Sequence, residues 1–189
     1  MEKLEVVGGK KLSGVLKISG SKNASLPILA ASLLSKKKIE LINLPQVKDI
    51  KTMLTLLESL GSKVKKVGKK TIIDNINQKK TEANYNIVRL MRGSFLVLGP
   101  LLAKFGKAKV SSPGGCSIGV RPIDIHLNAL IKLGVKIKIV DGYVIAKAPQ
   151  GLKGAKIRFP KISVGATENL IIAASLAKGT TILENCAIE

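Results

Sequence analysis

The amino-acid sequence predicts an α/β fold in which apolar helices form the centre and β-sheets form the outer layer. Three segments of the 189-residue chain are similar to one another, and each contains an apolar helix followed by a short strand. These helices are apolar on all sides, which is typical of helices enclosed by other elements. Other segments alternate apolar residues with lysine, as strands do when one sheet face packs on helices and the other meets water. The fold is therefore expected to consist of repeated units.

We expect the chain to divide into an N-terminal segment, two complete units and one incomplete unit. Their approximate bounds are residues 1–21, 22–84, 85–154 and 155–189. The N-terminal segment is expected to contribute strands, because GVLKIS at residues 14–19 alternates between apolar and polar residues.

The apolar helix and the strand after it define the repeat. The strand is short in all three units and is separated from the helix by only a few residues. The helices are LPILAASLL at residues 26–34, FLVLGPLLA at 95–103 and NLIIAASLA at 169–177, and the strands are at residues 38–43, 107–112 and 180–185.

A second helix, at residues 47–61, is predicted to be amphipathic. Its apolar residues recur at i, i+3, i+4 and i+7 and so share one buried face, which consists of Ile50, Met53, Leu54 and Leu57. Gly61 is a C-terminal stop signal for this helix. The second unit repeats the pattern and ends its helix at Gly134, 73 positions after Gly61. A lysine-alternating strand follows each glycine, at residues 63–67 and 135–140.

The third unit has no counterpart of the amphipathic helix. A repeat without its second half leaves apolar surface uncovered. We therefore expect a partner domain, a partner chain or the rest of a longer reading frame to complete it.

The composition favours small anionic partners. Hydrophobic residues make up 46% of the chain and aromatic residues 3%, so the core must consist mainly of aliphatic side chains. Lysine and arginine total 32 against 12 acidic residues, a net charge of +20, which attracts anions. Because the lysines are scattered and aromatic residues for base stacking are few, we do not expect a nucleic-acid partner.

Several other classes are excluded by the same inventory. Two cysteines, Cys116 and Cys186, and a single histidine, His126, are too few for a disulfide framework or a metal site. We expect neither a metal nor an organic cofactor. No signal peptide and no apolar stretch of membrane-spanning length is present, so no membrane association is expected and a cytoplasmic location is the default.

The first candidate site is ISGSKNASLP, residues 18–27, where a strand is expected to run into a helix. Backbone N–H groups at such a turn point outward, and Lys22 adds a positive charge, so a phosphate or carboxylate could bind. A plain helix cap by Ser21 or Asn23 explains the segment equally well.

The second candidate site is NIVRLMRGSF, residues 86–95. Arg89 and Arg92 are three residues apart and are predicted to share one face of a helix. Arg92 is nearer to the apolar helix, where an arginine usually needs an anionic partner. Gly93 suggests that a helix begins close by or that another element packs tightly against it.

The third candidate site is the loop around Cys116, which follows Pro113, Gly114 and Gly115. A cation at Arg121 favours the thiolate, the reactive form of cysteine. The glycines argue against simple burial of the thiol, so we favour a functional role. For Cys186 we favour packing, and for His126 a polar helix position.

The fourth candidate site, PKISVGATEN at residues 160–169, leads into the third apolar helix. Lys161 and the small residues Ser163, Gly165 and Ala166 would let a ligand approach the backbone. By itself this pattern is weakly specific.

Taken together, the segments ISGSKNASLPIL, VRLMRGSFLVLGPLLAKFG, SSPGGCSIGVRPIDIHLNALIKLG and SVGAT resemble those of the UDP-N-acetylglucosamine 1-carboxyvinyltransferase family, the enolpyruvyl transferases that open peptidoglycan synthesis. The resemblance extends over essentially the whole chain. It implies an inside-out α/β barrel of the EPSP synthase type and two substrates, phosphoenolpyruvate and UDP-N-acetylglucosamine, with no metal or organic cofactor.

The resemblance also implies roles for individual residues. Lys22 and Asn23 would meet phosphoenolpyruvate and the sugar. Cys116 would form a covalent adduct with phosphoenolpyruvate, protonate its methylene carbon and be alkylated by fosfomycin. Arg121 would face the phosphate of phosphoenolpyruvate. The residues implied to bind the UDP-sugar are Arg92, Arg121, Pro122, Ile123, Asp124, Ile125, Lys161, Ile162, Ser163 and Val164.

Family members are about twice as long as this chain and have two such domains with the catalytic cleft between them. Residues 1–21 would then belong to the second domain, and a general-base aspartate and a further arginine would lie in a part that this chain lacks. The alternatives are the sister enzyme acting on shikimate 3-phosphate, which does not use a loop cysteine, and a noncatalytic basic binding module.

Overall fold

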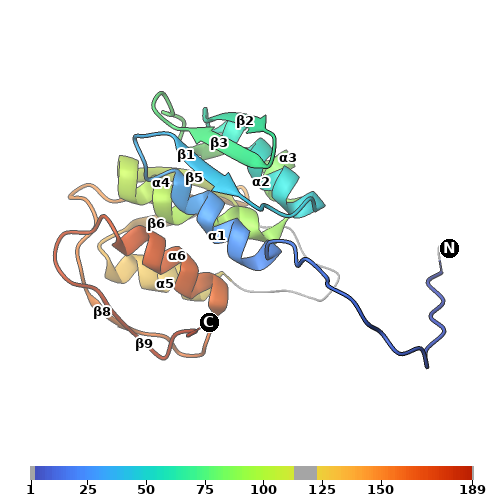
Figure 1. The fold of residues 1–189 in the computed structure, drawn as a ribbon. Helices are drawn as coiled ribbons and strands as arrows, with labels where there is room; N and C mark the ends of the chain where they lie inside the picture. Colours follow the sequence, from blue (N-terminus) through green and yellow to red (C-terminus); the bar gives the residue numbers. More distant parts are fainter. Residues whose placement is uncertain (1–2, 113–122, 189) are drawn as a thin grey trace.

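The computed structural model describes residues 3–112 and 123–188 and has an α/β fold with helices inside and sheets outside (Figure 1). The inner helices come one from each unit, as the repeat predicts. Their bounds are α1 (Lys22–Ser32), the 3₁₀ helix η1 (Arg92–Val97) continued by α4 (Leu98–Phe105), and α6 (Val164–Ala174).

The first unit forms a three-stranded sheet in the order β1-β3-β2, in which β3 (Lys70–Asp74) pairs antiparallel with both neighbours. The edge strands are β1 (Ile39–Ile42) and β2 (Lys63–Val67). The amphipathic helix α2 (Lys48–Ser59) connects them, and Gly61 follows it with a φ of 102°, a conformation that favours glycine.

The second unit repeats this arrangement, since β5, β7 and β6 occur in the same order with the same antiparallel pairing. A two-residue strand, β4, pairs parallel with β5 at the other edge. The elements of the unit are β4 (Glu82–Ala83), α3 (Tyr85–Val88), β5 (Lys107–Ser111), α5 (Asp124–Lys132), β6 (Lys136–Val140) and β7 (Tyr143–Lys147).

The third unit contains α6 between two parallel strands, β8 (Lys156–Arg158) and β9 (Ile182–Glu184). This is the same parallel pair with an intervening helix that β4, α4 and β5 form in the second unit. The strand pairing therefore confirms the repeat that the sequence alignment predicts.

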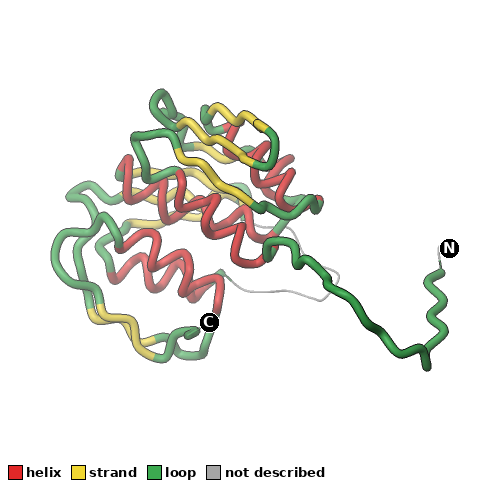
Figure 2. Tube along the Cα trace, in the orientation of Figure 1, coloured by secondary structure: helices red, strands yellow, loops and turns green. Residues whose placement is uncertain are grey.

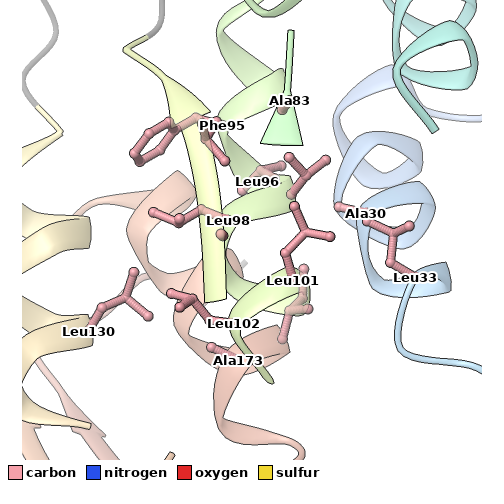
Figure 3. Packing of buried hydrophobic residues seen from close by; sticks show 14 of the residues in the cluster. Ala30, Leu33, Ala83, Phe95, Leu96, Leu98, Leu101, Leu102, Leu130 and Ala173 are labelled. Atoms are coloured by element: carbon pink, nitrogen blue, oxygen red, sulfur yellow. The ribbon is translucent and has the colours of Figure 1, made fainter. Parts of the chain in front are cut away.

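The core lies where the inner helices meet. Figure 3 shows Leu98, Leu101 and Leu102 of α4 among side chains from α1, α5 and α6. All three leucines are at most 1% exposed. As the composition requires, aliphatic residues dominate the buried cluster, and Phe95 and Phe159 are its only fully buried aromatic side chains among the described residues.

One expectation about the inner helices is wrong, and the strands expected in the N-terminal segment are not formed within the described residues. Residues 14–19 form no strand: the N-terminal segment leads away from the folded body (Figure 2), and residues 3–19 are exposed although Lys17, Ile18 and Ser19 lie beside Ile42 of β1. A strand needs a partner for its backbone groups, and no described strand pairs with this segment. Helices α1 and α6 are also not enclosed on all sides, since Ile28 is 49% and Ile171 is 57% exposed.

Candidate functional site

A cavity of about 810 Å³ lies at the N-terminal ends of the inner helices of all three units. Backbone N–H groups at helix N-termini are incompletely paired and carry partial positive charge, so they attract anions. The polar and charged residues that line the cavity are Ser21, Lys22, Asn23, Asp49, Arg89, Arg92, His126, Thr167 and Glu168.

Lys22 is the first residue of α1 and projects into this region. Ser21 caps the helix by accepting a hydrogen bond from the Ala24 N–H at 3.3 Å, which leaves Asn23 outside the capping role. Lys22 Nζ lies 3.0 Å from Asp49 Oδ2, with the lysine side chain 48% exposed. The segment therefore combines a capped helix with a cation, so the two interpretations of its sequence are compatible.

Arg89 and Arg92 both line the cavity, but not from one helix. Helix α3 ends at Val88, Met91 has extended backbone angles of −154° and 128°, and η1 begins at Arg92. The prediction of a single helix is wrong because the chain turns between the two arginines. Gly93 fits the tight-packing prediction, since a β-carbon there would lie 3.1 Å from Leu26 Cδ1.

The fourth candidate segment reaches the cavity only in part. Val164 and Gly165, the first residues of α6, line it. Ser163 caps the helix by accepting from the Ala166 N–H at 3.3 Å. Lys161 and Ile162 precede the cap, are exposed, and are not among the lining residues.

The start of α5 contributes one of its three expected residues to the cavity. Ile123 lines it, whereas Asp124 is exposed in the first helical turn and Ile125 is only 5% exposed in the core. Three further predicted site residues, Cys116, Arg121 and Pro122, lie outside the described residues.

His126 is a cavity residue that sequence reasoning missed. Expected at an ordinary polar helix position, it is instead 4% exposed, and its ring meets Phe95 edge to face with centroids 5.4 Å apart. Burial, and secondarily the positive charge of Arg92, lower its pKa from 6.5 to about 4. When the two amphipathic helices are aligned on Gly61 and Gly134, His126 corresponds to Met53, which is buried. This correspondence is the sequence signal that could have predicted the burial of His126.

Asp49 and Glu168 also line the cavity and were not singled out by the sequence. Of the described lining residues, Lys22, Arg89 and Arg92 are basic and these two are acidic. The basic side chains and the helix N-termini suit a ligand with phosphate or carboxylate groups.

Metal-binding groups do not gather at this site. Within residues 3–112 and 123–188, no three His, Cys, Asp or Glu side chains lie close enough together to hold a metal ion. In the same part of the chain, no helix has the length and apolar character needed to cross a membrane.

Comparison with protein families gives a match over residues 6–189 to the family described as EPSP synthase (3-phosphoshikimate 1-carboxyvinyltransferase). The UDP-N-acetylglucosamine 1-carboxyvinyltransferases of Pelagibacter ubique and a Sulfurovum species are 69% and 58% identical to the chain. Both matches cover all of this chain and 45% of the relative, so the chain spans about half the length of the curated relatives it matches.

Solved structures show the same fold at lower identity. The enolpyruvyl transferase NikO from Streptomyces tendae matches with a TM-score of 0.77 at 22% identity, over 93% of this chain and 41% of that one. EPSP synthase from Acinetobacter baumannii matches with a TM-score of 0.74 at 18% identity, with the same two coverages.

Proposed function

Because the chain belongs to the EPSP synthase (3-phosphoshikimate 1-carboxyvinyltransferase) family, we propose that its protein transfers the enolpyruvyl group of phosphoenolpyruvate to the 3-hydroxyl of UDP-N-acetylglucosamine. A new C–O bond forms to the sugar oxygen, the C–O bond to the phosphate breaks, and inorganic phosphate leaves. The hydroxyl proton goes to a base. This would be a cytoplasmic step of peptidoglycan synthesis.

The observation that carries the choice of acceptor is the 69% identity, across the whole chain, to a relative named UDP-N-acetylglucosamine 1-carboxyvinyltransferase. The cavity geometry agrees with this choice. A phosphate, a carboxylate and a diphosphate must be held close together, and fixed cations with helix N-termini reduce their repulsion. Lys22, Asn23 and Arg92 line the cavity, which supports the proposal.

We assign the remaining roles as the family resemblance implies. Cys116 is the thiol that forms an adduct with phosphoenolpyruvate and protonates its methylene carbon, and Arg121 binds the phosphate. The residues assigned to the UDP-sugar are Arg92, Arg121, Pro122, Ile123, Asp124, Ile125, Lys161, Ile162, Ser163 and Val164. Because the side chain of Ile125 is buried, any contact it makes is through its backbone.

We also propose that a second domain completes the cleft and covers residues 3–20. The relatives are more than twice as long as the matched part. Leu16 and Ile18 are 82% and 75% exposed, and apolar side chains two residues apart lie on the same face of a strand. Without that domain, the chain is expected to bind substrates weakly and to turn over little.

The test is phosphate release from phosphoenolpyruvate by a protein that joins this chain to the remainder of the relatives' length. We expect release to depend on UDP-N-acetylglucosamine and to be absent with shikimate 3-phosphate. Release only with shikimate 3-phosphate would identify the sister enzyme instead. Tight DNA binding that weakens steeply with salt, without release in either arm, would indicate the basic binding module.

Fosfomycin provides a second readout in the same protein. We expect one covalent addition on Cys116, promoted by the UDP-sugar and abolished in Cys116→Ser. The half-buried Cys186 serves as the internal control. A mass shift confined to Cys186 would contradict the assignment of the loop thiol.

A further inference from the structure

Three groups from different elements form a buried chain of hydrogen bonds beside the cavity. Asn169 of α6 is 0% exposed, and its Oδ1 accepts a hydrogen bond from the Gly99 N–H of α4 at 2.8 Å. The Asn169 Nδ2 lies 3.2 Å from Nδ1 of His126 in α5. This chain therefore links a backbone donor, an amide and an imidazole across three helices.

The direction of these bonds fixes where the histidine proton lies. A backbone N–H can only donate, so the atom of Asn169 that faces Gly99 must be the amide oxygen. The amide nitrogen then faces His126, and since it too can only donate, the imidazole Nδ1 must accept. A neutral imidazole that accepts at Nδ1 carries its proton on Nε2.

The repeat indicates that this polar pair is not required for packing. Aligned on their shared Ala-Ala-Ser, the first and third inner helices place Leu26 opposite Asn169, and the amphipathic helices place Met53 opposite His126. Both counterparts in the first unit are buried apolar residues. Because buried polar groups are costly unless fully paired, a polar contact between the second and third units at positions that are apolar in the first suggests a role beyond stability.

The Nε2 edge of the ring faces Gly165, which lines the cavity. His126, Arg92 and Gly165 all line it, and a β-carbon on Gly165 would lie 3.6 Å from Nε2 and 3.5 Å from Cε1. A glycine at this position keeps side-chain atoms away from the Nε2 edge. The ring and Arg92, whose positive charge acts on it, therefore border the same cavity.

We propose that Asn169 is a positioning residue that holds His126 in its neutral, Nε2-protonated form, so that the ring donates a hydrogen bond to a phosphate oxygen of the bound substrate. The identity of that substrate as a UDP-sugar rests on the proposed function. A neutral donor beside Arg92 adds a directed hydrogen bond without adding a second like charge. The low pKa of His126 agrees with this arrangement, because it keeps the ring neutral at physiological pH.

The tautomer can be measured directly, because His126 is the only histidine in the chain. Two-bond ¹H–¹⁵N spectra of the histidine-labelled 189-residue chain at pH 8 distinguish the protonated ring nitrogen from the accepting one. We expect Nε2 to carry the proton. The change Asn169→Asp keeps the shape but replaces the donor with an acceptor, so the proton should move to Nδ1. A mixture of tautomers in the unsubstituted chain, or no change in Asn169→Asp, would overturn the proposal.

A functional readout uses the protein that joins this chain to the remainder of the relatives' length, with UDP-N-acetylglucosamine and inorganic phosphate as probes and His126→Met to assign the ring signal. Each is expected to shift the Nε2–H signal, and Asn169→Asp is expected to weaken UDP-sugar binding roughly tenfold, the equivalent of one hydrogen bond. In case Asn169→Asp folds poorly, the double variant Asn169→Leu/His126→Met places at both positions the buried apolar residues that the first unit has there. It should fold normally and show the same loss of binding.

The two probes separate the inference from the proposed function. If the UDP-sugar does not bind but phosphate shifts the Nε2–H signal, the proposed acceptor is wrong and the positioning role stands. If the UDP-sugar binds equally well to the unsubstituted chain and to both variants, the proposed acceptor stands and the role of Asn169 and His126 is refuted. Binding of neither probe at the Nε2–H group also refutes it.

Discussion

The close approach of α4 to α6 at Gly99 makes Gly99→Ala the most informative stability variant. A β-carbon at Gly99 would overlap Asn169 Oδ1 and would lie 2.6 Å from the Asn169 backbone oxygen. A backbone oxygen cannot rotate away, so the two helices must separate. That movement also breaks the 2.8 Å hydrogen bond from the Gly99 N–H.

The expected cost follows from these two effects. Overpacking costs about 1–3 kcal/mol, and a buried donor without an acceptor costs about 1–3 kcal/mol. The gain in helix propensity from glycine to alanine offsets about 1 kcal/mol. The net loss should be about 1–5 kcal/mol. Since each kcal/mol lowers the melting temperature of a chain of this size by about 2–4 °C, the decrease should be roughly 2–20 °C.

Urea and thermal unfolding followed by circular dichroism measure this loss. Gly165→Ala is the matched control, because its β-carbon would make ordinary contacts of 3.5–3.6 Å with His126. It should be neutral or slightly stabilising. If Gly99→Ala unfolds within about 0.5 kcal/mol of the unsubstituted chain, the scale of an ordinary surface change, the reasoning about helix approach is refuted.

Three further predictions use charged or titrating groups. The pKa of His126 is lowered from 6.5 to about 4 by burial, so between these values the unfolded chain binds the proton and the folded chain does not. Its stabilising contribution is present above pH 6.5 and lost towards pH 4, by about 3 kcal/mol. Urea unfolding measures the free energy of unfolding between pH 6.5 and pH 4. We expect it to fall by about 3 kcal/mol less in His126→Met than in the unsubstituted chain. Equal falls in both proteins would contradict a buried, neutral His126. Lys104→Met removes the hydrogen bond that Lys104 Nζ donates to the carbonyl of Leu33, the C-cap residue of α1, at 2.8 Å. Urea unfolding should show that the free energy of unfolding falls by about 1–2 kcal/mol. An unchanged midpoint would show that Lys104 does not stabilise the C-terminal end of α1. Asp49→Asn removes the carboxylate that pairs with Lys22 at 3.0 Å. Because Lys22 would then be released from this ion pair and the site would lose a negative charge, calorimetry should show severalfold tighter binding of phosphoenolpyruvate. Weaker binding would count against Lys22 as an anion ligand.

The features predicted well from the sequence are those that occur in more than one of the repeated units. The amphipathic helix predicted at residues 47–61 is α2, and its apolar positions Met53 and Leu57 are fully buried. The strand at residues 63–67 that is predicted after Gly61 is β2, and the strand predicted at residues 135–140 contains β6. Apolar periodicity and helix stop signals are local features of the sequence. Because the repeat contains each of them twice, the second copy supports the prediction made from the first.

The features that the sequence did not reveal depend on distant partners. Arg89 and Arg92 have helical spacing, yet the extended backbone of Met91 separates them. The burial of His126 depends on Asn169, which is 43 positions away in the chain. Local patterns carry no information about such contacts, and only the comparison of units indicates that His126 occupies a core position.

The exposed residues 3–20 affect how the chain behaves in solution. Seven large apolar residues of this segment are 75–103% exposed (Leu4, Val6, Val7, Leu12, Val15, Leu16 and Ile18). An extended segment with unpaired backbone groups and apolar side chains is a template for pairing between copies. When produced alone, the chain should therefore aggregate through its N-terminus, and trimming by a protease ahead of Ser21 should leave a more soluble body that still unfolds cooperatively.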